Sequence, residues 1–577
     1  MKQFVLDIEA NGLDPDTVWC IVVRQLGGHD DSLTWSGDRL PEFITWLQKQ
    51  DECELIGHNL IGYDIPVLEK ILAVDFSKCK ITDTLVMSRL ANPSREGGHS
   101  LDNWGSILNC PKGDHNVWDV FSYDMLEYCI QDVRVNALVY QRLLSELRGF
   151  ESESIDLEHQ VQSIVTQQIK QGWLLDQEKA YHLLATLKEK KNDLEDEVHQ
   201  VFKPLPTFVK EITPKFKKDG TQSVVGLKFL GDNWEEAVAP FSRIDFPVFN
   251  LGSRQQIGRH LQYYGWKPKQ FTETGQAIVD EAVLGTVKGI PQAALIAEYL
   301  MIQKRVAQVQ SWLEAVKEDG RVHGYVNPNG AVTGRMTHSS PNMGQVPAVY
   351  SPYGKQCRDV WTVPEGYKLV GMDASGLELR MLAHYMNDEG YTNEILTGDI
   401  HTANQLASGL ETRDQAKTFI YAFLYGAGDA KIGSIVGGTA KDGKRLKEKF
   451  LGNTPSLGRL RERVGVASGR GYVLGLDGRR VYVRSQHAAL NTLLQSAGAI
   501  VMKKALCLLD EYATKWNIDY NFIGNIHDEI QTEVREEKSE VFGRLATSCV
   551  EAAGLHYKLN CPLAGEFKVG DSWADTH

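Results

Sequence analysis

The sequence predicts a multidomain chain that combines α/β and α+β parts. Its 577 residues are enough for three to five domains with separate hydrophobic cores. A short apolar run at residues 369–370 reads as a buried strand, and a helix-like pattern at 377–382 follows it. Short apolar runs on both sides of Gly524-Asn525, within 522–531, are instead typical of a β-hairpin. Strand-then-helix order in one place and a hairpin in another predict the mixed fold class.

Composition and charge are those of an ordinary globular protein, with 42% hydrophobic and 24% charged residues. The net charge of -13 is a weak argument against a nucleic-acid partner, because binding depends on where Lys and Arg lie. Nine cysteines without a C-x-x-C pair predict reduced core thiols of a cytosolic protein. Asp7 and Glu9 stand where a signal peptide needs an apolar core, and no run approaches membrane-spanning length. We therefore expect a soluble intracellular protein with no membrane partner.

Two carboxylates far apart in the chain form the first candidate site. Asp373 ends the strand predicted before it, and Asp528 follows the predicted hairpin turn. Either residue alone would more often be a turn or cap residue. If the hairpin lies beside the strand, the two acids converge where divalent ions can bind. Two such ions about 4 Å apart support phosphoryl transfer.

Residues 1–147 contain a second set of carboxylates. Asp7 and Glu9 lie in a strand-like run, whose period of two places them on one face. Asp64 ends the segment G-H-N-L-I-G-Y-D, and Tyr128 and Asp132 are four residues apart, on one face of a helix. An acidic-x-acidic pair is common, so a solvated strand face would be the simpler interpretation of the first pair by itself.

The order D-x-E, N-x3-Y-D and Y-x3-D resembles the DEDDy family of 3′–5′ exonucleases over this whole segment. The resemblance implies a ribonuclease H-like domain at 1–147 in which four acids hold two divalent ions, and none of them is replaced here. These acids are Asp7, Glu9, Asp64 and Asp132. Tyr128 would orient the attacking water. Hydrolysis of a phosphodiester needs an activated water and a cation on the departing 3′ oxygen, which such a set can supply.

The middle of the chain is predicted to be mainly helical. An apolar stripe from Ile155 to Ile169 breaks at Gly172-Trp173, and Asp176 can cap the next helix. Residues 203–253 are rich in proline and lysine and read as an irregular or short-stranded insertion. Its lysines are either contacts to a phosphate backbone or simply solvated, and the two interpretations have equal weight.

A further helix is predicted at residues 412–426, with a cationic and aromatic face. Thr412 and Gln415 form a capping-box pattern, and Gly426 can end the helix. Its polar face repeats at steps of four through Arg413, Lys417, Tyr421 and Tyr425. An ordinary polar stripe would have mixed charge signs and fewer aromatic rings. Two cations suit a triphosphate, and two rings suit a base and sugar.

Three motifs together resemble family A DNA polymerases. They are D-x-S-x-x-E at 373–378, R-x3-K-x3-Y at 413–421 with Y-G at 425–426, and H-D-E at 527–529. With T-G-R at 333–335 and L-N-T-L-L-Q-S-A-G-A at 490–499, the chain is most similar to replicative polymerases of short-tailed bacteriophages. The resemblance covers essentially the whole chain and implies a right-hand fold after the nuclease domain. Its parts would be the thumb at 148–320, the palm at 321–388 and 487–577, and the fingers at 389–486.

The resemblance also assigns roles to residues. Asp373, Asp528 and the Ala374 carbonyl would hold two Mg²⁺ ions, which Mn²⁺ can replace. The contacts to the incoming triphosphate would come from His401, Arg413 and Lys417, and Lys417 would also protonate the departing pyrophosphate. Each site would thus hold two ions.

The remaining implied roles concern the sugar, the base pair and the DNA. Tyr421 would stack near the nascent pair, and its hydroxyl implies weak rejection of 3′-deoxygenated nucleotides. Glu378 would block a ribose 2′-OH. The DNA contacts would come from Arg335 and Gln495 in the minor groove, His527 near the primer terminus, and Tyr425. Minor-groove acceptors occur in every correct pair, so such contacts can check pair geometry.

The implied partners are primer–template DNA and deoxynucleoside triphosphates, in the cytoplasm of an infected bacterial host. Residues 203–253 are short for the insertion that holds a processivity factor in relatives, so that partner is not carried over. Relatives hold the tail of a replicative helicase–primase with a longer basic loop before 475–480. Here Arg470, Arg479 and Arg480 stand nearby, and the helicase contact stays open.

Three other functions compete with this interpretation. A cellular-type family A repair polymerase is the nearest, but the intact nuclease acids and the lack of an N-terminal 5′ nuclease domain favour the phage type. A nuclease whose C-terminal half only binds DNA is disfavoured by the complete acids and the cationic helix face. A single-subunit RNA polymerase is disfavoured by Glu378 and by the proofreading domain.

Overall fold

The computed structural model describes residues 1–28, 31–50 and 52–577, which form two compact units. One unit contains Met1–Leu175 and Ala315–His577, and the other is Asp176–Glu314. The smaller unit lies within the range 148–320 expected for the thumb. Helix α6 (Ser152–Gln171), which falls in the same range, packs in the larger unit against strand β16 and helix α19.

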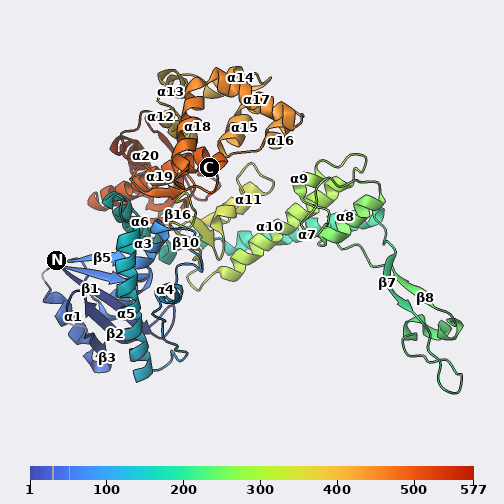
Figure 1. The fold of residues 1–577 in the computed structure, drawn as a ribbon, viewed down its shortest axis with the longest axis horizontal. Helices are drawn as coiled ribbons and strands as arrows, with labels where there is room; N and C mark the ends of the chain where they lie inside the picture. The colour runs from blue at the N-terminus through green and yellow to red at the C-terminus, as the bar shows by residue number, and fades with distance from the viewer. Residues whose placement is uncertain (29–30, 51) are drawn as a thin grey trace. The chain divides into compact units, whose positions relative to one another are not determined.

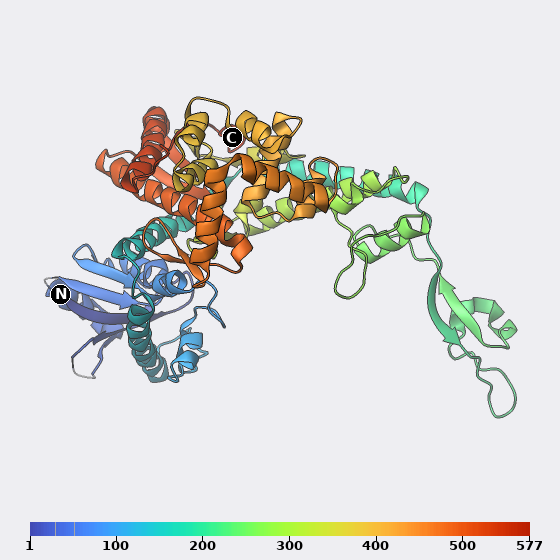
Figure 2. The ribbon, with the colours of Figure 1, turned by 45° about the horizontal axis from the view of Figure 1, so that its top comes forward.

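The first 147 residues are built on a five-stranded mixed sheet with the order β3-β2-β1-β4-β5 (Figures 1 and 2). Its strands are β1 (Lys2–Ala10), β2 (Val18–Gln25), β3 (Leu33–Ser36), β4 (Cys53–Gly57) and β5 (Cys79–Asp83). Its helices are α1 (Leu40–Gln48), α2 (Ile65–Leu72), α3 (Thr84–Ala91), α4 (Leu101–Ile107) and α5 (Tyr123–Glu146), with a π-helical turn η2 (Leu60–Asp64) and a short η1 (Gly37–Arg39). β1 pairs antiparallel with β2 and parallel with β4.

The period of two along β1 divides its side chains between two hydrophobic cores. Phe4, Leu6 and Ile8 pack on the core that also contains residues of α1 and α2. Val5 faces the other core, which contains residues of α3, α4 and α5. Asp7 and Glu9 therefore share the face that α5 covers. The sheet and this long helix bring Asp7 and Glu9 towards Tyr128 and Asp132.

The other sheet of the larger unit has four strands in the order β16-β17-β13-β18. These strands are β13 (Tyr367–Ala374), β16 (Tyr520–Ile526), β17 (Glu529–Arg535) and β18 (Gly565–Gly570). Helices α6 and α20 (Ser539–His556) pack on it, and α19 (Ala489–Lys515) packs against both of them and against α12 (Leu377–Met386). β13 is a central strand that pairs antiparallel with both β17 and β18. Its run of buried residues, Leu369 to Met372, explains the apolar pattern seen in the sequence.

Residues 387–486 of the larger unit are mostly helical. Their elements are α13 (Glu389–Leu396), α14 (Ile400–Ser408), α15 (Arg413–Leu424), α16 (Asp429–Ser434), α17 (Ala440–Asn453), α18 (Pro455–Ser468) and the hairpin β14 (Tyr472–Leu474) and β15 (Arg480–Tyr482). The short elements that precede this sheet in the chain are β6 (Trp173–Leu175), β9 (Arg321–Val322), β10 (Tyr325–Asn327), β11 (Thr337–Ser339), η4 (Met343–Gln345), α11 (Gly354–Asp359) and β12 (Trp361–Thr362). Two short turns, η5 (Gln486–Ala488) and η6 (Glu536–Lys538), lead into α19 and α20.

The smaller unit contains two long helices, α7 (Gln177–Val201) and α10 (Ala293–Ala315), which lie side by side (Figure 1). Its other elements are β7 (Thr207–Ile212), η3 (Lys228–Glu236), β8 (Phe241–Asp245), α8 (Arg254–Tyr263) and α9 (Glu281–Leu284). As predicted, Asp176 caps α7 by accepting a hydrogen bond from the Lys179 N–H. Residues 203–253 are short-stranded, because β7 and β8 form a two-stranded ribbon.

The predicted mixed fold class is confirmed, but the hairpin turn was misplaced. Gly524-Asn525 lies inside β16, where the register shifts in a bulge between Phe522 and Gly524. The turn itself is His527-Asp528, and His527 adopts a left-handed φ of 59°. A glycine inside a strand marks a bulge as readily as a turn, and here the Trp173 ring packs where a Gly524 side chain would lie. Asp528 is therefore in the turn and does not follow it.

Two smaller expectations also need correction. By length and composition, the helical stretch Gln486–Lys515 could cross a membrane, so the statement that no run approaches that length is wrong. Inside this fold, 83% of the apolar window is buried, as in the core helix of a globular protein. Of the nine cysteines, Cys79 and Cys110 are only partly buried and so are not core thiols.

Candidate active sites

Asp373 and Asp528 meet at one end of the four-stranded sheet. Glu529, the first residue of β17, is the register partner of Asp373 on β13, and the Ala374 N–H donates to the Asp528 carbonyl over 3.0 Å. Both acids line one cavity of about 510 Å³. The predicted convergence is therefore confirmed, since the antiparallel pairing of β13 and β17 places the end of one strand beside the start of the other.

Among the described residues, neither acid forms a close ion pair, although His577 acts on Asp373 and His527 and Arg335 act on Asp528 from farther away. The next acid in the chain, Glu529, has close partners. Partial burial and then repulsion from Asp528 raise the pKa of Asp373 to about 7. Burial and then repulsion from Glu378 raise the pKa of Asp528. Glu529 accepts a hydrogen bond from Trp573 Nε1 at 2.6 Å and lies 3.3 Å from His577 Nδ1. Burial raises the pKa of Glu529, but these partners outweigh it and lower the pKa.

The donor atoms at this end of the sheet suit a hard divalent cation. Two carboxylates that share a cavity without a close ion pair among the described residues are incompletely compensated, and a bound metal ion would balance their charge. The side-chain donors are oxygens alone, the ligands that Mg²⁺ prefers.

Helix α15 brings one residue of its predicted face, Tyr421, to the same cavity. The predicted Thr412–Gln415 capping box is present. Tyr421 lines the cavity beside the two acids, and its ring centroid lies 6.2 Å from that of His401. Arg413 is held by Asp399 through two contacts, Nε to Oδ2 at 2.7 Å and Nη2 to Oδ1 at 3.2 Å. Lys417 is exposed on the same helix.

Glu378 is fixed by two residues that the sequence placed in other roles. The Tyr425 hydroxyl donates to Glu378 Oε1 at 2.7 Å, and Arg335 Nη2 lies 3.1 Å from the same oxygen. The Glu378 side chain is 17% exposed. A carboxylate with a phenol and a guanidinium on one oxygen has little freedom to rotate, so its position beside the acid cavity is defined.

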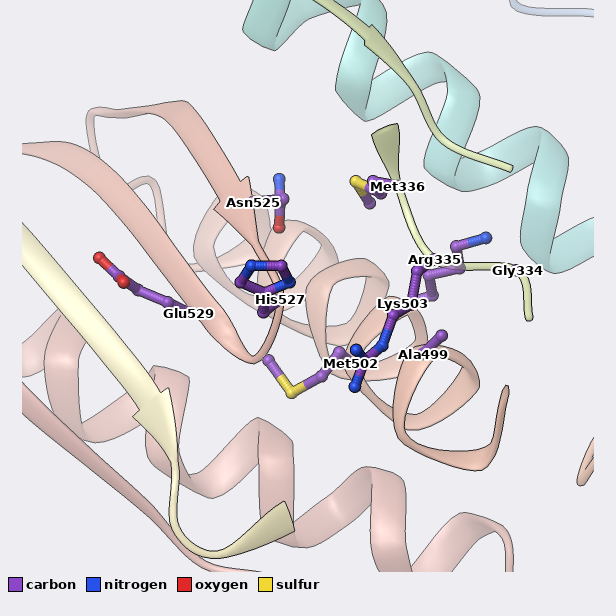
Figure 3. A pocket seen from close by; sticks show the side chains of 9 residues that line it. All are labelled: Gly334, Arg335, Met336, Ala499, Met502, Lys503, Asn525, His527 and Glu529. Carbon is purple, nitrogen blue, oxygen red and sulfur yellow. The ribbon is translucent and has the colours of Figure 1, made fainter. Parts of the chain in front are cut away.

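A small pocket lies beside the hairpin β16–β17 (Figure 3). Its lining residues come from three segments: the loop before β11, helix α19 and the hairpin, from which the Glu529 carboxylate points away from the others. The lining residues are Gly334, Arg335, Met336, Ala499, Met502, Lys503, Asn525, His527 and Glu529. Arg335 and His527 are thus brought together, as two of the predicted DNA contacts. Gln495, on an earlier turn of α19, is not among the residues that line this pocket.

The four acids of the N-terminal part also assemble, and we call them the acid cluster: Asp7, Glu9, Asp64 and Asp132. Ligand atoms of Asp7, Glu9 and Cys129 all lie within 4.8 Å of one another. Asp64 Oδ1 accepts a hydrogen bond from the Ile8 N–H at 3.2 Å, which places it beside β1. Asp7 and Asp132 line one cavity of about 830 Å³.

Local structure explains how Asp64 reaches this position. Asp64 ends the π-helical turn η2, whose N–H groups are held by Asp83 at the end of β5. Asp83 accepts hydrogen bonds from the Asn59 and Ile61 N–H groups, both at 3.0 Å. It also caps α3 by accepting from the Leu85 N–H at 2.9 Å. Asp83 therefore supports the acid cluster without belonging to it.

Charge repulsion is concentrated in the acid cluster. Burial and then neighbouring carboxylates raise the pKa values of Asp7, Glu9 and Asp64. Asp132 Oδ1 is buried and has no hydrogen-bond partner among the described residues. Buried acceptors are normally satisfied, so an unpaired carboxylate oxygen in such a group fits the role of a ligand to a divalent cation. The acid cluster fits divalent ions, and Tyr128 lies one helical turn before Asp132 on α5.

The comparisons with known proteins begin with a family model. The model for DNA polymerase family A matches residues 230–575. The chain belongs to this family. The DNA-directed DNA polymerase of Escherichia phage T7 is 36% identical to it, over 91% of this chain and 92% of that protein. The corresponding enzyme of Enterobacteria phage T3 has the same identity and coverage.

Cellular members of family A are more distant from this polymerase. DNA polymerase I of Aquifex aeolicus is 26% identical over 91% of this chain and 88% of that protein. Among solved structures, the polymerase domain of Pol1 from M. smegmatis, in complex with DNA primer–template and dNTP, has a TM-score of 0.79. It is 20% identical and covers 99% of this chain and 96% of its own, which supports the fold.

Sequence reasoning missed several residues of this polymerase. Lys112 and Cys129 enter the acid cluster, but neither belongs to a motif that would have indicated it. The structure also contains a buried group of two acids and two bases, which we call the charge-paired cluster: Glu158, Asp477, Arg479 and Lys503. Arg479, one of the three arginines named near the possible helicase contact, is only 3% exposed and binds Asp477 and Glu158.

Proposed function

We propose that this DNA polymerase adds deoxynucleotides to a primer 3′-OH at Asp373 and Asp528, with two Mg²⁺ ions. The observation that carries the proposal is the cavity at the strand ends, which both acids line together with Glu378 and Tyr421. Asp373, Asp528 and the Ala374 carbonyl would hold the ions, and Mn²⁺ can replace Mg²⁺. When bound, the ions supply activation of the attacking oxygen and stabilisation of the leaving oxygen.

The cationic end of α15 binds the triphosphate in this proposal. Arg413 exchanges its bidentate contact with Asp399 for phosphate oxygens, two of which can accept the same pair of N–H bonds. Lys417 is unobstructed and donates a proton to the departing pyrophosphate. His401 contacts the same phosphates, and its Nδ1 is buried without a hydrogen-bond partner among the described residues.

Selection of the nucleotide rests on the residues around Tyr421. Tyr421 stacks near the nascent pair, because it faces the acid cavity from the end of the cationic stripe. Glu378, fixed by Arg335 and Tyr425, occupies the space of a ribose 2′-OH. A rigid carboxylate rejects an added hydroxyl more strongly than a mobile one, since it cannot turn aside.

Two of the proposed contacts to the DNA duplex come from the small pocket beside the hairpin β16–β17. Arg335 and His527 line the small pocket there, and Gln495 and Tyr425 complete the proposed set. Arg335 and Gln495 read minor-groove acceptors, which every correct base pair presents. Primer–template DNA and deoxynucleoside triphosphates are thus the proposed substrates.

We also propose a 3′–5′ excision activity at the acid cluster. Asp7, Glu9, Asp64 and Asp132 hold two divalent ions, and Tyr128 orients the attacking water from the adjacent turn of α5. The carboxylates are crowded and carry raised pKa values, and one oxygen of Asp132 is unpaired. These features are those of a site that gains stability when cations bind.

The setting proposed for the enzyme is replication in the cytoplasm of a phage-infected bacterium, since phage polymerases are among its relatives. A replicative helicase–primase is a proposed partner. With Arg479 buried, Arg470 and Arg480 are the remaining basic residues near 475–480 for such a contact.

Primer extension by the purified chain tests the proposal directly. Asp528→Asn should abolish extension of a primed template in Mg²⁺ while single-strand degradation continues. The matched control, Asp519→Asn, changes an exposed acid before β16 and should extend normally. Loss of both activities in Asp528→Asn would refute two separate sites, and extension by Asp528→Asn would refute the polymerase site itself.

A further inference from the structure

Lys112 places an ammonium group inside the acid cluster. It lies in the loop between α4 and α5, and its Nζ is 2.6 Å from Asp132 Oδ2. The Asp132 side chain is 5% exposed and that of Lys112 is 23% exposed, so the pair is largely removed from water. Lys112 Nζ also lies 4.6 Å from the centroid of the Tyr128 ring. One cation thus contacts both a proposed metal ligand and the residue proposed to orient the attacking water.

Two of the other cations that line the same cavity, Lys70 and Arg89, have partners outside the acid cluster. Lys70 Nζ is 2.9 Å from Asp14, and Arg89 Nη2 donates to the Tyr325 hydroxyl at 3.1 Å. Among the described residues, Lys112 is the one lysine or arginine in an ion pair with a member of the acid cluster. Four acids and one base leave the cluster with a deficit of positive charge. The ammonium therefore compensates one carboxylate and leaves the others for divalent ions.

A divalent ion and Lys112 compete for the same carboxylate. Lys112 holds Oδ2 of Asp132, so an ion that binds the unpaired Oδ1 shares the carboxylate charge with the ammonium and repels it. When the ion binds, the ammonium loses its partner but stays tethered beside Tyr128. A scissile phosphate placed between the metal ligands and Tyr128 is an anion that would replace the lost partner.

We propose that Lys112 is a further residue of the excision site, which competes with the divalent ion for Asp132 and then contacts the scissile phosphate. This inference rests on the excision activity proposed above and extends it. Removing the charge of Lys112 should change metal affinity and excision rate in opposite directions. Metal affinity should rise, because Asp132 loses its resident cation, and excision should slow, because the phosphate loses a contact.

Mn²⁺ titration followed by electron paramagnetic resonance measures the first consequence. The parent protein carries Asp373→Asn and Asp528→Asn, so that the polymerase site does not bind the ion. The Mn²⁺ bound at the excision site is the part of the signal that disappears when Asp7→Ala and Glu9→Ala are added to the parent. Lys112→Met should bind this Mn²⁺ about tenfold more tightly than the parent, and Lys112→Arg should bind it like the parent.

Single-turnover degradation of a single-stranded 3′ end measures the second consequence. Lys112→Met should be about 10- to 100-fold slower at saturating Mg²⁺, and Lys112→Arg should recover most of the rate. The matched control is Lys80→Met, since Lys80 pairs with buried Glu54 at 3.6 Å in the same sheet, outside the acid cluster. Lys80→Met should change neither measurement.

Unchanged or weaker Mn²⁺ binding in Lys112→Met would overturn the competition for Asp132. An unchanged excision rate at saturating Mg²⁺ would overturn the phosphate contact. A parent protein that degrades no DNA would instead refute the proposed excision activity. In that case the Mn²⁺ titration still decides whether Lys112 competes for Asp132, so the two failures are distinguishable.

Discussion

The acid cluster and the charge-paired cluster are both buried groups of charge in the larger unit, but their charge balance is opposite. The charge-paired cluster sets two acids against two bases. Lys503 Nζ contacts both oxygens of Glu158, at 2.7 and 2.8 Å, and Arg479 bridges Glu158 and Asp477. The acid cluster sets four carboxylates against one ammonium.

The pKa values of the two clusters follow this difference. Burial raises the pKa of Glu158, but Lys503 and Arg479 outweigh it, so the pKa falls. Burial and repulsion together raise the pKa of Asp7 and Glu9. A balanced cluster is satisfied by the protein itself and joins α6, α19 and the β14–β15 hairpin. An unbalanced cluster needs a cation from solution, and that need distinguishes a site from a structural support.

The largest effect expected from this comparison is on excision. Asp7→Ala with Glu9→Ala should reduce single-strand degradation by about 10⁴-fold, because the ligands of the ions that activate water are lost. Primer extension should be unchanged, and the melting temperature of the metal-free protein should not fall, since repulsion is relieved. Asp38→Ala with Glu42→Ala, two exposed acids of the same part, is the matched control. Degradation that survives in the first variant would remove the excision assignment.

The balanced cluster should respond in stability and not in metal binding. Glu158→Gln leaves Lys503 and Arg479 with too little negative charge in the core, which costs about 3–5 kcal/mol in the free energy of unfolding. Urea unfolding measures this change in the free energy of unfolding. Glu153→Gln on the same helix breaks the more exposed pair with His556 and should cost less than about 1 kcal/mol. Equal unfolding midpoints for the two variants would contradict the distinction between the clusters.

Glu378 shares a feature with each cluster. It has close partners, like the residues of the charge-paired cluster, but it faces a cavity, like residues of the acid cluster. Glu378→Ala should raise kcat/KM for ribonucleotides relative to deoxynucleotides by about 10- to 100-fold. Tyr425→Phe removes only the 2.7 Å hydrogen bond that fixes the carboxylate and should have a smaller effect of the same sign. Steady-state incorporation of single nucleotides measures both. A Glu378→Ala enzyme with unchanged selectivity would show that this carboxylate is not the sugar gate.

The smallest effect expected is on pH dependence. The pKa of Asp373 is raised from 3.8 to about 7 in the folded protein, so its contribution to stability is full below pH about 4 and is lost as pH rises through about 7. Glu158, whose pKa is lowered, contributes in the opposite sense: its stability is present above pH about 4.5 and is lost as the pH falls. In EDTA, the melting temperature should therefore fall by a few degrees between pH 6 and 8, and Asp373→Asn should reduce that fall. Mg²⁺ should raise the melting temperature more at pH 8 than at pH 6, because Asp373 is then ionised. An equal increase at both pH values would contradict the raised pKa of Asp373.

Periodicity and motif order predicted most of the elements that carry the sites. The strand before Asp373, the capped helix at Thr412 and the face shared by Tyr128 and Asp132 were all read from local patterns. The hairpin turn at His527-Asp528 was misplaced because a glycine inside a strand gives the same local signal as a turn. Local patterns decide which residues form a helix or strand, but they do not decide which strand pairs with which.

The sequence by itself determined the fold class and the identity of the acids, because these depend on periodicity and on residue types in order. Only the tertiary structure decided the charge balance around those acids. Lys112 joins Asp132 from a loop twenty positions earlier, and Glu158 meets Lys503 across 345 positions of the chain. Such contacts depend on packing between distant elements. Residue spacing carries no record of them, and they separate a cluster of unbalanced negative charge from a balanced buried one.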